Sequence, residues 1–166
     1  MKLSVIYYSV SGNTQDMARC IAEGMNTVPG AEARAFSIDA LDVDFVRESQ
    51  CVVFGCPTYA AGMPADFHTN LWKAGDLHLA GKLGGAFATA QYAHGGGELA
   101  IQNILTNLMV KGMLLYSGGG AKGRPVIHLG PVAIATAGNE EMRKPYEELF
   151  RTYGQRMAGK AAELFN

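Results

Sequence analysis

Short apolar stretches alternate with segments of helical periodicity along the whole chain, and this alternation restricts the fold more than any other feature. Residues 2–8 form a β-branched and aromatic run, and residues 51–55 are apolar at every position, as central parallel strands are. After such runs, apolar residues recur every three to four positions. This alternation predicts an α/β fold in which helices pack against a parallel sheet.

The pattern predicts five strands, the last of them interrupted. The interruption separates residues 113–116 from a second apolar run at residues 132–135. Helices are expected between the strands and at the end of the chain. Right-handed crossovers then give a doubly wound parallel sheet with helices on both faces. Because 166 residues are the length of one domain, we expect a single domain over residues 1–166. The expected strands are residues 2–8, 33–38, 51–55, 83–90 and 113–116.

The charge balance and the cysteines exclude several classes of partner. Fourteen Lys and Arg residues oppose fifteen Asp and Glu residues, so the formal net charge of −1 attracts neither nucleic acid nor an anionic membrane. No apolar run reaches the roughly 18 residues of a transmembrane span, and the first residues lack the pattern of a signal peptide. The three cysteines form no C-x-x-C pair. We therefore expect a cytoplasmic protein with no metal, membrane or nucleic-acid partner.

The loop after the first strand has the composition of a phosphate-binding turn. Its hydroxyls, its glycine and the start of the next helix offer hydrogen-bond donors to an anion without any lysine. It lacks the G-K-[ST] and G-x-G-x-x-G patterns, so neither a nucleotide triphosphate nor a Rossmann dinucleotide is favoured. The alternative is that its polar side chains only cap the helix. The candidate residues are Ser9, Val10, Ser11, Gly12, Asn13 and Thr14.

Two further loops follow the third and fourth strands, and the fold brings all three to one edge of the sheet. Each also has a simpler interpretation, a chain reversal for the first of these two loops and a flexible loop for the second. The lone His94 has no second ligand at metal-binding spacing. The loop after the third strand offers turn formers and one aromatic ring for a flat heterocycle: Pro57, Thr58, Tyr59, Ala60 and Gly62. The last loop offers glycines that permit close approach of the backbone: Thr89, Ala90, Gln91, Tyr92, Gly95, Gly96 and Gly97.

These motifs resemble those of the flavodoxin superfamily, and most closely the tryptophan-repressor-binding-protein-like NAD(P)H:quinone oxidoreductases. The similarity begins with Ile6-Tyr7-Tyr8-Ser9-Val10-Ser11-Gly12-Asn13-Thr14 and continues through residues 54–59, Gly62-Met63, residues 95–98 and Gly112-Met113. It therefore covers nearly the whole chain. The resemblance implies a flavodoxin-like sheet of strand order 2-1-3-4-5 and bound FMN. The phosphate would lie on the first loop, and the ring between the other two.

The chain departs from those quinone reductases at three places. An arginine is usual where Tyr59 stands, and a histidine pair is usual where Val110 and Lys111 stand. The insertion that those enzymes have before the third strand is missing here. None of these differences touches the phosphate loop.

The resemblance implies an oxidoreductase that uses FMN, with NADH or NADPH as electron donor and a quinone-like small molecule as acceptor. Tyr92 and His94 are then the candidate catalytic residues, for proton delivery or for positioning of the acceptor. The alternative is a flavodoxin that carries electrons without being an enzyme. Such carriers are typically very acidic, so the net charge of −1 favours the enzyme. The low charged fraction of 17% also predicts a homo-oligomer, most simply a dimer.

Overall fold

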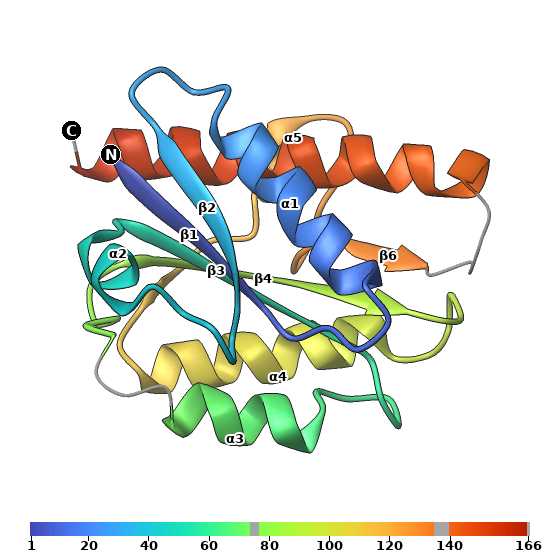
Figure 1. The fold of residues 1–166 in the computed structure, drawn as a ribbon. Helices are drawn as coiled ribbons and strands as arrows, with labels where there is room; N and C mark the ends of the chain where they lie inside the picture. Colours follow the sequence, from blue (N-terminus) through green and yellow to red (C-terminus); the bar gives the residue numbers. More distant parts are fainter. Residues whose placement is uncertain (74–76, 135–139, 166) are drawn as a thin grey trace.

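A computed structural model describes residues 1–73, 77–134 and 140–165 of the chain. A parallel sheet lies at the centre, with helices on both of its faces (Figure 1). The elements are β1 (Lys2–Tyr7), α1 (Asn13–Met25), β2 (Glu32–Ser37), α2 (Val43–Glu48), β3 (Cys51–Pro57), α3 (Ala65–Lys73), β4 (Leu83–Ala90), α4 (Gly97–Val110), β5 (Leu114–Leu115), the short 3-10 helix η1 (Gly120–Lys122), β6 (Val132–Ile134) and α5 (Glu140–Phe165).

The strand order is β2-β1-β3-β4-β5, and every pairing is parallel. The predicted flavodoxin-like, doubly wound sheet is confirmed. β5 pairs with Leu83 and Gly84 of β4, whereas β6 pairs with residues 88–90 of the same strand. The two short strands thus lie along the same edge of β4, one at its beginning and one at its end, which confirms the interrupted last strand. Of the predicted run 132–135, residue 135 lies outside the described residues.

Each face of the sheet has its own hydrophobic core. α1 and α5 cover one face, and α3 and α4 cover the other (Figure 1). The first core includes Ile21 of α1 and Phe150 of α5, and the second includes Phe67 of α3 and Ile101 of α4, all fully buried. These apolar side chains explain why the segments between strands fold as amphipathic helices.

Helices α1 and α5 pack closely because glycines stand at their crossing. A Cβ on Gly154 of α5 would lie only 3.0 Å from the backbone nitrogen of Met25 in α1. The two backbones therefore approach one another directly, and side chains on either side of the contact can pair between the helices. Within the described residues, no helix is both long and apolar enough to cross a membrane.

The strand register brings three loops to the same edge of the sheet. Tyr7 at the end of β1 pairs with Gly55 of β3, and Pro57 at the end of β3 pairs with Thr89 of β4. The chain segments that follow β1, β3 and β4 consequently leave the sheet side by side. This edge is where a doubly wound sheet places a ligand.

Candidate functional site

The three loops enclose a cleft of about 330 Å³ at the carboxyl ends of β1, β3 and β4. All of its lining residues are among those that the sequence analysis selected, although their role in binding a cofactor stays a prediction. None of these lining residues is charged. They are Val10, Ser11, Asn13, Thr14, Pro57, Thr58, Tyr59, Thr89, Ala90 and Gln91.

The first loop leads into α1 without a side-chain cap. The residue preceding the helix is Gly12, whose φ of 93° lies in the left-handed region, and no side chain caps the helix there. The Ser9 hydroxyl accepts a hydrogen bond from the Gly12 N–H at 3.2 Å, and Asn13 Nδ2 donates to Ser11 Oγ at 3.2 Å. The simpler hypothesis, in which the polar side chains of this loop cap the helix, is not what the structure shows. The first N–H groups of α1, which have no helical acceptor, stand at the cleft.

A buried hydrogen bond connects the first loop to the sheet. Thr14 Oγ1 and Thr89 Oγ1 lie 2.8 Å apart, and both side chains are buried. The sequence predicts Thr14 to be a phosphate-binding residue, but its hydroxyl already has a partner within the protein. Thr14 therefore holds the first turn of α1 against the end of β4.

The loop after β3 is a tight hairpin with two alanines in an unfavourable conformation. Tyr59 and Gly62 exchange both of their backbone hydrogen bonds at 3.0 Å. Ala60 and Ala61 between them have φ values of 47° and 61°, the left-handed region that costs an L-residue about 1–2 kcal/mol. Strain of this kind is concentrated at ligand-binding loops.

This hairpin rests on the glycine turn that follows β4. Gly96 has a φ of 92°, and a Cβ on it would lie 2.7 Å from the Cα of Ala61. Only glycine fits this position, because a side chain would collide with the backbone of the hairpin. The contact fixes the two loops that form the walls of the cleft.

The Thr58 hydroxyl is buried without a hydrogen-bond partner among the described residues. The backbone N–H of Thr58 donates to the carbonyl oxygen of Thr89 at 2.7 Å, which fixes the residue on the wall of the cleft. A buried polar atom without a partner is rare in a folded protein. A polar group of a ligand in the cleft would satisfy this hydroxyl.

The two candidate catalytic residues lie outside the residues that line the cleft. The Tyr92 side chain is 61% exposed, and its ring centroid is 6.4 Å from that of His94, which is also exposed. The pair stands on the loop that follows β4. Its role in catalysis stays a prediction.

Sequence reasoning missed Arg143 of α5, which lies next to the cleft. Arg143 lines a small pocket that shares Asn13 and Thr89 with the cleft. Its Nη1 donates to Asp16 Oδ2 at 3.1 Å. No local motif marks this arginine, because it follows the first loop by about 130 residues and reaches it only through the packing of α5 on α1.

The cysteines take no part in the site. Burial raises the pKa of the Cys56 thiol to about 12 and that of Cys20 to about 11, so both thiols stay protonated and unreactive near neutral pH. Within the part of the chain that the structure describes, no three side chains of His, Cys, Asp or Glu gather closely enough to hold a metal ion.

Several known proteins are similar in sequence to this chain. The sequence model of the family described as "Flavodoxin" matches residues 5–98, the segment that contains all three loops. A flavodoxin of Clostridium saccharobutylicum is 39% identical over 165 residues, which are 99% of this chain and 100% of the relative. An NAD(P)H dehydrogenase (quinone) of Chromohalobacter salexigens is 30% identical over 198 aligned positions, with 98% of each chain covered.

Solved structures confirm the likeness of fold. A WrbA-like flavodoxin from Agrobacterium tumefaciens superimposes with a TM-score of 0.76 at 24% identity, covering 98% of both chains. A flavodoxin from an archaeon has a TM-score of 0.71 at 22% identity, covering 98% of this chain and 99% of the other. These structures support the fold, and the family model and the full-length relative support the family. The chain belongs to the flavodoxin family.

Proposed function

We propose that the protein binds FMN in the cleft and uses it to transfer electrons. Membership of the flavodoxin family supports this cofactor. The volume of about 330 Å³ lies within the range typical of small-molecule sites. The single observation that carries the proposal is the unpartnered Thr58 hydroxyl in a cleft that also contains the uncapped end of α1.

The residues of the cleft divide into two groups by what they would hold. Ser11, Asn13 and the first N–H groups of α1 would hold the phosphate, since hydroxyl, amide and helix end all favour an anion. Thr58 and Tyr59 would flank the flavin ring, with the Thr58 hydroxyl bonding its polar edge. The bound flavin supplies the redox chemistry, and the protein binds and orients it.

We propose an electron carrier as the first candidate role. The flavodoxin relative matches end to end at 39% identity. The quinone dehydrogenase is less similar, and its alignment runs over 198 positions, so that enzyme has segments that this chain of 166 residues lacks. The residues lining the cleft also include no cation that would pair with the phosphates of a nicotinamide dinucleotide. These observations favour a carrier over the enzyme that the net charge of −1 suggested.

A reductase that passes electrons from NADH or NADPH through FMN to a quinone-like acceptor is the second candidate. One observation favours it. The cleft has no acidic lining residue that would attract a basic protein partner, and its wall carries Val10 and Tyr59, which suit a small flat molecule. In this role Tyr92 and His94 would border the acceptor.

The cofactor can be identified directly. Flavin released by heat from the purified protein should co-migrate with FMN on chromatography. A Ser11→Ala variant should bind FMN at least about tenfold more weakly, because a hydrogen bond to a charged acceptor is worth roughly 1.5–3 kcal/mol. Riboflavin, which has no phosphate, should bind the variant as it binds the wild type. Recovery of FAD, or equal losses for both flavins, would contradict the proposed site.

Rapid mixing distinguishes the two roles. FMN-loaded protein is mixed with excess NADH or NADPH, with and without a small benzoquinone, and the flavin absorbance is followed. A carrier should keep its oxidised spectrum for minutes and lose it only when dithionite or a separate reductase protein is added. Bleaching of the flavin within seconds, followed by recovery on addition of the quinone, would establish the reductase.

The predicted homo-oligomer remains part of the proposal. Tyr59 and Val126 are 48% and 55% exposed, and a second copy of the chain would cover such apolar side chains. Light scattering at micromolar concentration should give the mass of a dimer, and the mass of one chain would contradict it. The cytoplasmic location also stays a prediction, as does the lack of nucleic-acid and membrane partners.

A further inference from the structure

Two arginines of α5 form matching ion pairs with acidic residues of α1. Arg143 Nη1 donates to Asp16 Oδ2 at 3.1 Å, and Arg151 Nε donates to Glu23 Oε2 at 2.9 Å. Glu147 lies between the two arginines, accepting from Arg143 Nε at 2.9 Å and pairing with Arg151 Nη2 at 3.6 Å. The two ion pairs thus have the same chemistry and join the same two helices.

Only one of the pairs adjoins the cleft. Asp16 belongs to the first turn of α1, whereas Glu23 lies seven residues further on, about 10 Å along the helix axis. The pocket that Arg143 lines shares Asn13 and Thr89 with the cleft. The guanidinium of Arg143 therefore lies next to the end of α1 at which the phosphate is expected.

The position of Asp16 makes its partner important. A carboxylate in the first turn of α1 favours the helix, but it repels a phosphate that binds to the same turn. Arg143 balances that charge. Arg19 also approaches Asp16, although its Nη1 is 3.8 Å from Asp16 Oδ1 and its side chain is 62% exposed. Since Asp16 and Arg143 are themselves 36% and 46% exposed, solvent and salt weaken their effect without removing it.

We propose that Arg143 is a specificity-determining residue of the cofactor site. By neutralising Asp16, it allows the first turn of α1 to accept a phosphate group, and it thereby sets the preference for FMN over riboflavin. This inference rests on the proposed FMN site and adds to it a residue from the opposite end of the chain.

The matched variants Arg143→Gln and Arg151→Gln test this role. Each substitution removes one arginine that pairs α5 with α1 and that also contacts Glu147. Any general loosening of α5 therefore affects both variants. Apoprotein is titrated with FMN and with riboflavin by quenching of flavin fluorescence, at low and at high salt. For Arg143→Gln we expect the Kd for FMN to rise about five- to tenfold at low salt and about twofold at high salt. Riboflavin binding should not change, and Arg151→Gln should bind both flavins as the wild type does.

A second substitution tests the charge balance itself. Adding Asp16→Asn to Arg143→Gln removes the carboxylate that has lost Arg143, so FMN affinity should return to within about twofold of the wild type. The inference is overturned if Arg143→Gln leaves FMN binding unchanged or weakens both flavins equally. It is also overturned if Arg151→Gln has the same effect or if Asp16→Asn restores nothing. Failure of the wild type to bind FMN would instead contradict the proposed function, and with it this inference, before any variant is compared.

Discussion

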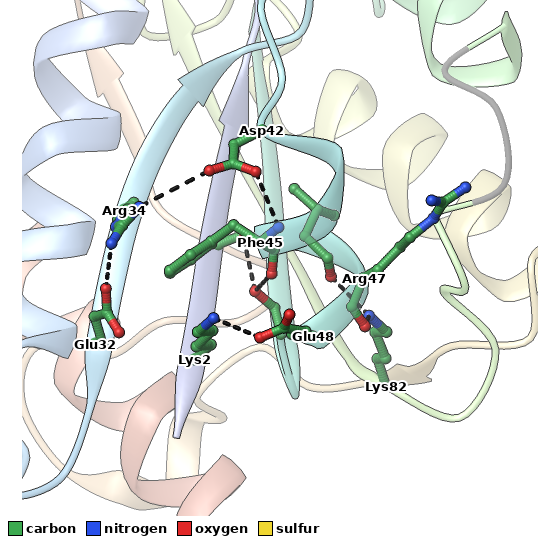
Figure 2. A network of polar contacts seen from close by, with 11 residues as sticks. Lys2, Glu32, Arg34, Asp42, Phe45, Arg47, Glu48 and Lys82 are labelled. Carbon is green, nitrogen blue, oxygen red and sulfur yellow. Dashed lines mark hydrogen bonds and ion pairs between the residues drawn. The ribbon is translucent and has the colours of Figure 1, made fainter.

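The two ends of the strands differ in how their polar groups are satisfied. At the amino ends, a network of charged residues connects α2 to the sheet (Figure 2). Phe45 is buried at its centre, with the Arg34 guanidinium 4.4 Å and the Lys2 ammonium 5.2 Å from the ring centroid. Lys82 Nζ donates to the carbonyl oxygens of Val46 at 2.7 Å and Arg47 at 2.6 Å, at the carboxyl end of α2. The positive charge of Lys82 thus lies at the carboxyl end of the helix, where the helix dipole favours a cation.

The carboxyl ends show the opposite arrangement. There the Thr58 hydroxyl is buried without a partner, α1 begins without a side-chain cap, and Ala60 and Ala61 adopt left-handed conformations. The amino ends have exceptions of their own, since Gln50 Oε1 is also buried without a partner in the described structure, and His78, in the segment before β4, has a φ of 50°. Stabilising contacts are thus concentrated at the amino ends of the strands. Polar groups that a ligand could bind are concentrated at the carboxyl ends.

The largest expected effect is at the centre of the network. Phe45→Ala should lower the free energy of unfolding by about 3–5 kcal/mol, because it removes a buried ring together with its two cation contacts. Urea denaturation of the apoprotein measures this loss. FMN affinity of the folded protein should stay unchanged, since the two regions are at opposite ends of the strands. A parallel loss of FMN affinity would show that they are not independent.

Removing a paired hydroxyl at the amino ends should have the next largest effect. Ser49 Oγ donates to the Phe45 carbonyl oxygen at 2.9 Å and is 2.8 Å from Ser4 Oγ, all of it buried. Ser49→Ala leaves those two groups without a partner and should destabilise the apoprotein by about 1–3 kcal/mol. The same urea experiment checks it, and an unchanged midpoint would mean that water replaces the lost contacts.

The unpaired hydroxyl at the carboxyl ends should respond in the opposite way. Thr58→Val replaces it with a methyl group of similar shape, so the apoprotein should be unchanged or more stable by about 1 kcal/mol. If Thr58 bonds the flavin ring, FMN and riboflavin should both bind roughly two- to tenfold more weakly. Titration of the variant with the two flavins decides the point. Unchanged affinity for both would remove Thr58 from the site.

The smallest effect is expected in the strained hairpin. Ala60→Gly relieves about 1–2 kcal/mol of left-handed strain and loses about 0.5–1 kcal/mol to the greater freedom of the unfolded chain. The apoprotein should therefore gain roughly half a kcal/mol. Ala162→Gly in α5 is the matched control, and it should lose about 1 kcal/mol because its backbone is helical. A loss at both positions would show that residue 60 is not strained.

Sequence patterns predicted the elements well where apolar residues set the boundaries. β4 (Leu83–Ala90) begins and ends where the sequence predicts it. The ends of other strands differ from the prediction in both directions. Residues 8, 113 and 116 lie beyond the last ladder pairs, whereas β2 begins one residue early at Glu32 and β3 continues past residue 55 to Pro57. Packing against neighbouring strands decides those ends, and a single sequence does not contain that information.

The loops of the site could be predicted, but their internal contacts could not. Strand order alone brings residues 9–14, 57–62 and 89–97 to one edge. The Thr14–Thr89 hydrogen bond and the Asp16–Arg143 ion pair join residues that are 75 and 127 positions apart. Ala60 and Ala61 give no signal either, because alanine is not a residue that favours left-handed turns.

The divided strand at the edge of β4 also bears on how the protein avoids aggregation. An open sheet edge offers a row of unpaired backbone groups to any other chain. Here that edge is occupied by two residues of β5 at its start and three of β6 at its end. The Ala88 N–H donates to the Pro131 carbonyl oxygen at 3.1 Å where β6 begins, and between the two short strands Gly130 lies against the backbone of Ala86. No long, continuous ladder is left on β4 for a foreign strand to extend.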